Sequence, residues 1–139
     1  PQIDAGAGRC LFVFDGPTAL YRMTGSCLPT RFIYPDHLNN ALEQNALGTS
    51  QVGEVARILA ARPPVIVTAD RPVTPQNRAA QRMVAAAIAR DYREIAVTPT
   101  KPKPMLGSRY CHDVIFHENR NTDGASAVHS FTIIPGTCH

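Results

Sequence analysis

Apolar runs of strand length alternate with helical patterns along the chain, and this alternation constrains the fold more than any other feature of the sequence. Leu11–Phe14 is a continuous apolar run, which is typical of a strand buried on both faces. Comparable strand segments stand at 31–34, 65–68 and 94–98. Strands that alternate with helices predict βαβ units, right-handed crossovers and a mainly parallel sheet.

Helix-start residues and apolar stripes mark the segments between these strands. We expect a short helix over 18–23, a second from Asp36 through Ala46, and a third capped by Ser50. The longest helix is expected from Pro75 to Tyr92, with Thr74 as its cap. A proline at the first helical position fits the preference of helix amino termini.

The last third of the chain changes character. Two strand segments, near 111–117 and 128–134, have no helix between them, and Asp123-Gly124 lies in the segment that joins them. This pattern predicts a β-hairpin. The expected fold class is therefore a three-layer α/β domain over 1–139, with about four mainly parallel strands and a C-terminal antiparallel hairpin extension.

Length and charge exclude several classes of protein. A chain of 139 residues suits one domain with a real core. Its net charge of +3 is too mild to indicate nucleic-acid binding. No apolar run approaches the ~20 residues of a membrane span, and no signal peptide opens the chain. Because Pro1 is not a natural start, we expect a fragment of a longer protein.

Four cysteines allow three interpretations. Cys111 and Cys138 would face each other across the expected hairpin, and Cys10 and Cys27 each stand just before an expected parallel strand. Both placements favour disulfide bonds, which indicate an oxidising compartment. Free buried thiols are the second interpretation. A metal site that uses the adjacent histidines is the third and least favoured, because neighbours on a strand point to opposite faces.

Five polar residues follow the carboxyl ends of the first three expected strands. Parallel sheets collect ligands at this edge, and a cation, a phosphate or a sugar could bind there. The alternative is structural, because aspartates are common in turns and at helix caps. The candidate ligand-binding residues are Asp15, Asp36, His37, Asp70 and Arg71.

No catalytic motif is complete. Leu11–Gly16 is similar to the opening of haloacid-dehalogenase phosphatases, but Val13 stands at the position of their nucleophilic aspartate. The sequence has no G-x-S-x-G elbow, and its Gly-rich stretch precedes the first strand instead of following it. We therefore assign no catalytic residue, cofactor or metal. We expect the isolated domain to hydrolyse neither phosphate esters, acyl esters nor glycosides.

The order of short motifs over the first two-thirds of the chain resembles one bacterial family. CLFVFDGPTALYRMTGSCLPTRFIYPDHL begins at Cys10, and EVARILAARPPVIVT ends at Thr68. Their order resembles the extracytoplasmic C-terminal region of membrane glycosyltransferases that use polyprenyl-phosphate sugars and are related to protein mannosyltransferases. In that family the catalytic acids lie close to the membrane, in a part this chain lacks.

The resemblance implies a non-catalytic accessory domain, periplasmic and tethered to the inner membrane in the full-length protein. Its partners would be the membrane-embedded part of the same protein and an acceptor glycan or protein, or a polyprenyl-phosphate sugar. The alternative is a free-standing secreted or periplasmic enzyme, or a ligand-binding module, that uses the carboxyl edge of the sheet.

Overall fold

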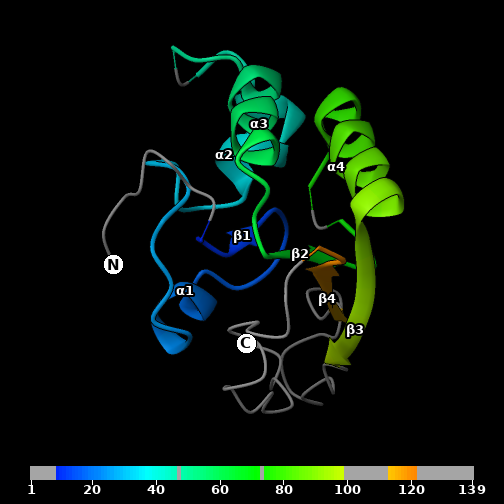
Figure 1. Ribbon diagram of the computed structural model, residues 1–139. Coiled ribbons are helices and arrows are strands. Elements are labelled where there is room, and N and C mark those ends of the chain that lie inside the picture. The colour runs from blue at the N-terminus through cyan, green and yellow to red at the C-terminus, as the bar shows by residue number, and fades with distance from the viewer. Residues whose placement is uncertain (1–8, 47, 73, 99–112, 122–139) are drawn as a thin grey trace, which may run out of the picture.

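Four strands form one mixed sheet in the order β1-β2-β4-β3 (Figure 1). The strands are β1 (Phe12–Val13), β2 (Val65–Ala69), β3 (Tyr92–Thr98) and β4 (Val114–Asn119). β1 and β2 are parallel, whereas β4 is antiparallel to both β2 and β3. This computed structural model describes residues 9–46, 48–72, 74–98 and 113–121.

Helices cover the sheet unequally. The helical elements are α1 (Ala19–Met23), α2 (Asp36–Asn39), the 3₁₀ turn η1 (Ala41–Glu43), α3 (Gln51–Ala60) and α4 (Arg78–Asp91). Figure 1 shows α3 and α4 side by side above the sheet and α1 below it. The fold is thus mixed α/β. The expected three-layer order is confirmed only in part, because α1 is the one helix among the described residues that covers the second face.

Two hydrophobic clusters fill the two faces of the sheet. The cluster under α2, α3 and α4 includes Phe12, Ile66 and Tyr92, which point to the same face. The cluster on the α1 side includes Val13, Val67 and Phe116. Successive residues of β1 and β2 therefore belong to opposite clusters, as the alternation of side chains along a strand requires. Burial on both faces confirms the interpretation of the apolar runs.

The segment 31–34 is not a strand, and this expectation was wrong. Thr30 Oγ1 accepts a hydrogen bond from the backbone N–H of Phe32 at 3.2 Å, so the backbone turns locally instead of joining a ladder. Prolines stand on both sides, at positions 29 and 35, and limit regular pairing.

Two helix predictions also change. The helix expected from Asp36 to Ala46 breaks at Asn40, whose backbone is extended, so that α2 and η1 replace it. The longest helix is confirmed, but it begins at Arg78 instead of Pro75. Its cap is Asn77, whose side chain accepts from the N–H of Ala80 at 3.2 Å. Thr74 is therefore not the cap.

The expected mainly parallel order is also only partly correct. β4 was predicted as the first strand of a hairpin, but it lies between β2 and β3 and pairs with both. Val67 of β2 and Ala96 of β3 both face Phe116 of β4 in the register. The second strand of the expected hairpin, near 128–134, lies outside the described residues. The same holds for residues 111 and 112, where the first strand was expected to begin. Among the described residues, no helix is long and apolar enough to cross a membrane.

Candidate functional site

Asp15 stands directly after β1, at the carboxyl end of the sheet. Its backbone N–H donates to Val67 O at 3.2 Å, which ties the turn to β2. Gly16 follows with φ of 151°, and a Cβ there would lie 3.2 Å from a methyl group of Val67. The turn therefore needs glycine at this position, and it holds Asp15 half-buried against the sheet.

The Asp15 carboxyl group has a pKa raised to about 6, first by burial and then by the negative charge of Asp36. A carboxyl group with this pKa is partly protonated near neutral pH. It can therefore donate or accept a hydrogen bond under physiological conditions, whereas an ordinary surface aspartate only accepts.

Helix α2 is fastened beside Asp15 by Asn39. The Asn39 Nδ2 group donates to the carbonyl of Phe14 at 2.8 Å, and the residue is only 1% exposed. This bond brings Asp36, at the start of the same helix, close enough to act on Asp15. Among the described residues, the buried Oδ1 of Asn39 and Nδ1 of His37 have no hydrogen-bond partner.

Aromatic rings continue the site along the loop before α2. The His37 ring packs edge-on against Phe32 and Tyr34, with centroid separations of 6.1 and 5.7 Å. The Arg31 guanidinium lies over Phe32 at 4.9 Å. Tyr34 is 62% exposed, so much of its ring is open to solvent next to the His37 ring. We call Asp15, Tyr34, Asp36 and His37 the aromatic–carboxylate surface.

A buried amide network holds the elements that carry this surface. Gln51 of α3 donates to the carbonyls of His37 at 3.0 Å and Asn40 at 2.8 Å. Asn77 donates its Nδ2 to Gln51 Oε1 at 2.8 Å. The amino termini of α3 and α4 are thereby joined to α2, and the loop positions become fixed by satisfied buried polar groups.

The five predicted binding residues fall into two groups. Asp36 lies close enough to Asp15 for its charge to raise the pKa of that residue, and His37 follows Asp36 on α2. Asp70 instead accepts from the N–H of Asp113 at 2.9 Å and pairs with Arg71 at 3.5 Å. It therefore closes the end of β2 against the start of β4.

Sequence reasoning missed Tyr34, Phe32 and the buried amides. The three apolar residues before Pro35 were assigned to a strand, which would have buried them. The flanking prolines were the signal against that assignment. Asn39, Gln51 and Asn77 carry no recognisable spacing, because their partners come from separate elements. They could not have been found without the fold.

His117 is a second buried titratable group, on the central strand β4. Its Nε2 lies 2.9 Å from Thr68 Oγ1. Burial lowers the pKa of His117, and the nearby charge of Glu94 opposes this effect. The neutral form of the ring is therefore favoured, and the contact with Thr68 joins β4 to β2.

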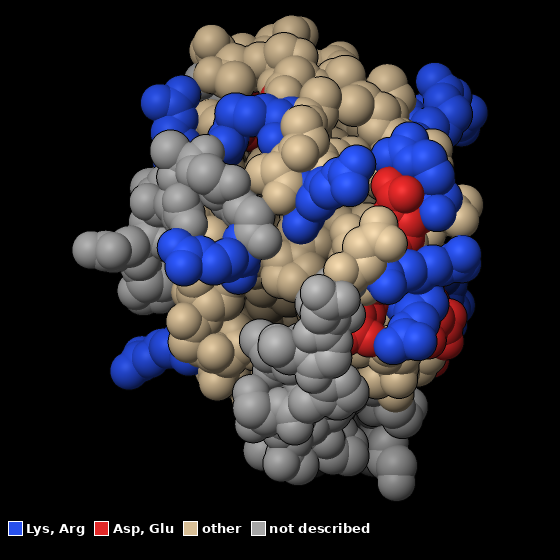
Figure 2. All heavy atoms as spheres, viewed as in Figure 1, with Lys and Arg blue, Asp and Glu red and all other residues tan. Residues whose placement is uncertain are grey.

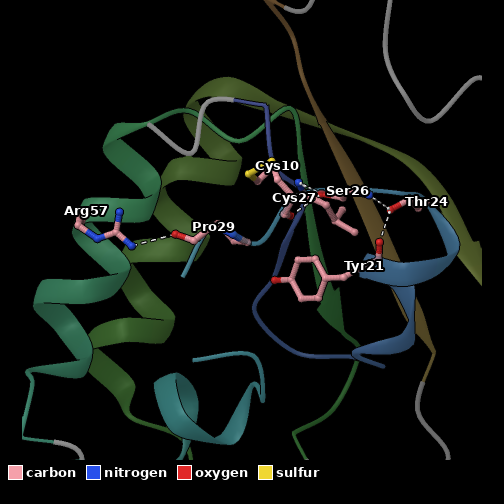
Figure 3. The surroundings of a disulfide bond; sticks show 8 residues. Cys10, Tyr21, Thr24, Ser26, Cys27, Pro29 and Arg57 are labelled. Carbon is pink, nitrogen blue, oxygen red and sulfur yellow. Dashed lines mark hydrogen bonds between the residues drawn. A yellow bond between two sulfur atoms is a disulfide. The ribbon is translucent and has the colours of Figure 1, made fainter. Parts of the chain in front are cut away.

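The disulfide between Cys10 and Cys27 is confirmed, with a Cα–Cα distance of 4.9 Å (Figure 3). Ser26 accepts from the N–H of Leu11 at 2.8 Å beside it, and Arg57 donates to the carbonyl of Pro29 at 2.8 Å. The bridge thus joins the start of β1 to the loop after α1. The predicted Cys111–Cys138 bridge lies outside the described residues.

The site combines one partly protonated carboxyl group, one exposed carboxylate and an exposed aromatic ring. Within the described ranges, no three histidine, cysteine or acidic side chains are grouped so that they could hold a metal ion. The carboxyl groups suit hydrogen bonding to hydroxyl groups, and the aromatic ring suits stacking on an apolar face. Comparisons with protein-family models, with curated proteins and with solved structures found no match to this chain.

Proposed function

We propose that this chain is a non-catalytic, extracytoplasmic accessory domain of a membrane glycosyltransferase-like protein, and that its aromatic–carboxylate surface contacts a hydroxyl-rich acceptor. The observation that carries the binding proposal is the exposed Tyr34 ring, which packs on His37 of α2. The first residue of the same helix, Asp36, raises the pKa of Asp15. The motif order from Cys10 to Thr68 supports the family assignment.

Each part of this surface suits one part of a sugar. The exposed face of Tyr34 offers apolar area at low entropic cost, which fits the C–H face of a pyranose. Asp36 accepts hydrogen bonds from hydroxyl groups, and Asp15 can also donate when it is protonated. The surface is open, so we expect weak binding with a Kd on the order of millimolar.

Two separate arguments support the proposed cellular location. The Cys10–Cys27 bridge is typical of oxidising compartments. Periplasmic placement and tethering to the inner membrane come from the family resemblance. In this proposal the membrane-embedded part of the same protein is the permanent partner. The glycan, acceptor protein or polyprenyl-phosphate sugar is the transient one.

A second candidate function is a free-standing secreted or periplasmic enzyme or binding module. The raised pKa of Asp15, about 6, favours it, because a group that titrates near neutral pH is suited to general acid–base catalysis. Asp36 would then stabilise the protonated form of Asp15, as paired carboxyl groups do.

The test is an NMR titration of the isotope-labelled chain with mannose oligosaccharides and with a short-chain polyprenyl phosphate. We expect shifts around Tyr34 and Asp36 with the oligosaccharide, lost in Tyr34→Ala and in Asp36→Ala. Leu42→Ala is the matched control, since Leu42 is also an exposed large side chain nearby in sequence but lies outside the surface.

Three outcomes would reject parts of the proposal. An absence of sugar-dependent shifts would remove the binding role. Shifts abolished by Arg71→Ala instead would move the site to the end of β2. Glycoside or ester hydrolysis that disappears in Asp15→Asn would replace the accessory domain with the enzyme.

A further inference from the structure

Basic residues predominate at one end of the sheet and acidic residues at the other. Since β1, β2 and β3 run in one direction and β4 in the other, the starts of the first three and the end of β4 share one edge. Arginines occupy that edge in the described chain, namely Arg9, Arg62, Arg90, Arg93 and Arg120. The opposite edge holds Asp15, Asp36, Asp70 and Asp113 beside Arg71.

Tyr92 lies close to three of these arginines, Arg62, Arg90 and Arg120. Arg120 donates its Nε to the carbonyl of Tyr92 at 3.1 Å, and the Tyr92 hydroxyl donates to Pro63 O at 2.6 Å, next to Arg62. Burial raises the pKa of Tyr92, a hydrogen bond with Asn119 lowers it, the Asp91 charge raises it, and the positive charges of Arg62 and Arg90 lower it. Both guanidinium groups are therefore near the Tyr92 ring.

Acids near these arginines neutralise only part of the charge. Arg90 pairs with Asp91 at 2.9 Å, and Arg93 pairs with Glu118 at 3.0 Å. Glu118 is buried, whereas the Arg93 side chain is 64% exposed. The arginines are consequently more exposed to solvent than their acidic partners. Figure 2 shows basic side chains at several places on the visible face of the molecule and fewer acidic ones.

Arg62 has an unusual backbone conformation for a residue with a side chain. It has a φ of 53°, in the left-handed region, and among the described residues it is the one non-glycine with positive φ. The position follows the last turn of α3, where glycine is the usual choice. An arginine in a conformation that favours glycine costs stability. A role for its guanidinium charge would explain why arginine stands at this position.

We propose that Arg62, Arg90, Arg93 and Arg120, which we call the arginine edge, dock the domain on an anionic phospholipid surface. The guanidinium groups are spread over the ends of three strands instead of converging on one point, so they fit a plane of phosphates better than a single anion. An oxidising compartment, indicated by the disulfide, makes a membrane a more available polyanion than nucleic acid. The docked domain turns its acidic edge, with the aromatic–carboxylate surface, away from the lipid.

The inference concerns a different surface from the proposed function, and it is tested separately. The experiment is co-sedimentation of the chain with phosphatidylcholine vesicles, with and without phosphatidylglycerol. We expect binding only with phosphatidylglycerol, and release by salt, because exposed charges are screened beyond about 8 Å at physiological ionic strength. Each arginine removed should weaken partitioning about fivefold.

Arg90→Gln and Arg71→Gln form a matched pair at opposite edges. Arg90 is 72% exposed beside Asp91 at 29%, and Arg71 is 77% exposed beside Asp70 at 31%. Both substitutions remove the same charge from the same kind of pair. We expect Arg90→Gln to weaken vesicle binding and Arg71→Gln to leave it unchanged. Arg62→Gly should weaken binding as well, while the chain keeps or raises its melting temperature.

Several results would overturn the proposal. Equal losses in Arg90→Gln and Arg71→Gln would reduce the effect to net charge. Equal binding to vesicles with and without phosphatidylglycerol would exclude an electrostatic docking surface. An absence of binding to both kinds of vesicle would exclude it as well. Binding of a nucleic-acid oligonucleotide with the same variant dependence, in the absence of vesicle binding, would assign the edge to another polyanion.

Discussion

Asp15 is the residue whose charge state matters most to the candidate site. Its pKa rises from 3.8 to about 6 on folding, so the folded protein holds this proton more tightly than the unfolded chain. Stability from this group is therefore greatest below about pH 4 and is lost as the pH rises through about 6. At neutral pH the buried charge is a cost.

Asp15→Asn should therefore stabilise the protein near neutral pH. After allowance for partial solvent screening, we expect a gain of about 1–2 kcal/mol at about pH 7 and almost none at about pH 4. Urea unfolding at the two pH values measures the difference. Asp36→Asn is the companion variant, and it should lower the pKa of Asp15. A gain for Asp15→Asn that is equal at both pH values would contradict the assignment.

Arg62 allows a second prediction at the same scale. Replacing it with glycine relieves the left-handed conformation of an L residue, a cost of about 1–2 kcal/mol, but adds the greater backbone entropy of glycine, about 0.5–1 kcal/mol. Arg62→Gly should therefore stabilise by about 0.5 kcal/mol, as the difference of these two effects. Ala61→Gly, with an ordinary φ of −75°, should destabilise. Loss of stability in Arg62→Gly would show that the arginine side chain holds the turn.

Helix caps give a sharp test at the scale of elements. Ser50 accepts from the N–H of Gly53 at 3.1 Å, so Ser50→Ala should cost about 1 kcal/mol. Asn77 caps α4 and also bonds Gln51, so Asn77→Ala should cost about 2–3 kcal/mol. Thr74→Ala, at the cap position predicted from sequence, should change the free energy of unfolding by less than about 0.5 kcal/mol. A larger effect at Thr74 than at Asn77 would restore the earlier helix start.

The elements that could be predicted from sequence are those with a strong local cause. The buried runs of β1 and β2 and the Ser50 cap of α3 belong to this class. The segment 31–34 failed because its strand propensity gave way to a turn made by Thr30. The position of β4 failed because strand neighbours are chosen by tertiary packing, which the local pattern does not contain. The Asn39 contact with the carbonyl of Phe14 could not be predicted either, because its two partners come from separate elements.

The disulfide between Cys10 and Cys27 contributes to the stability of the whole molecule. The bridge joins Cys10 and Cys27, which are 17 positions apart in the sequence, and its removal should cost about 3 kcal/mol by the loop-entropy model. Cys10→Ala/Cys27→Ala, compared with wild type in urea, measures this without touching the other two cysteines. Thiol titration of the denatured, unreduced protein should find neither Cys10 nor Cys27 free. Free thiols there after oxidative purification would remove the argument for an oxidising compartment.

The place of β4 in the sheet has a consequence for the order in which the chain can fold. Val65 of β2 pairs with Glu118 of β4, and Tyr92 of β3 pairs with Asn119. A chain that emerges amino end first from a ribosome or a translocation channel therefore displays β2 and β3 before the strand that joins them exists. Until then β2 keeps an unpaired edge on that side, which invites association with other strands. Such long-range pairing is slow, so the interval before β4 arrives is when this protein most needs a chaperone.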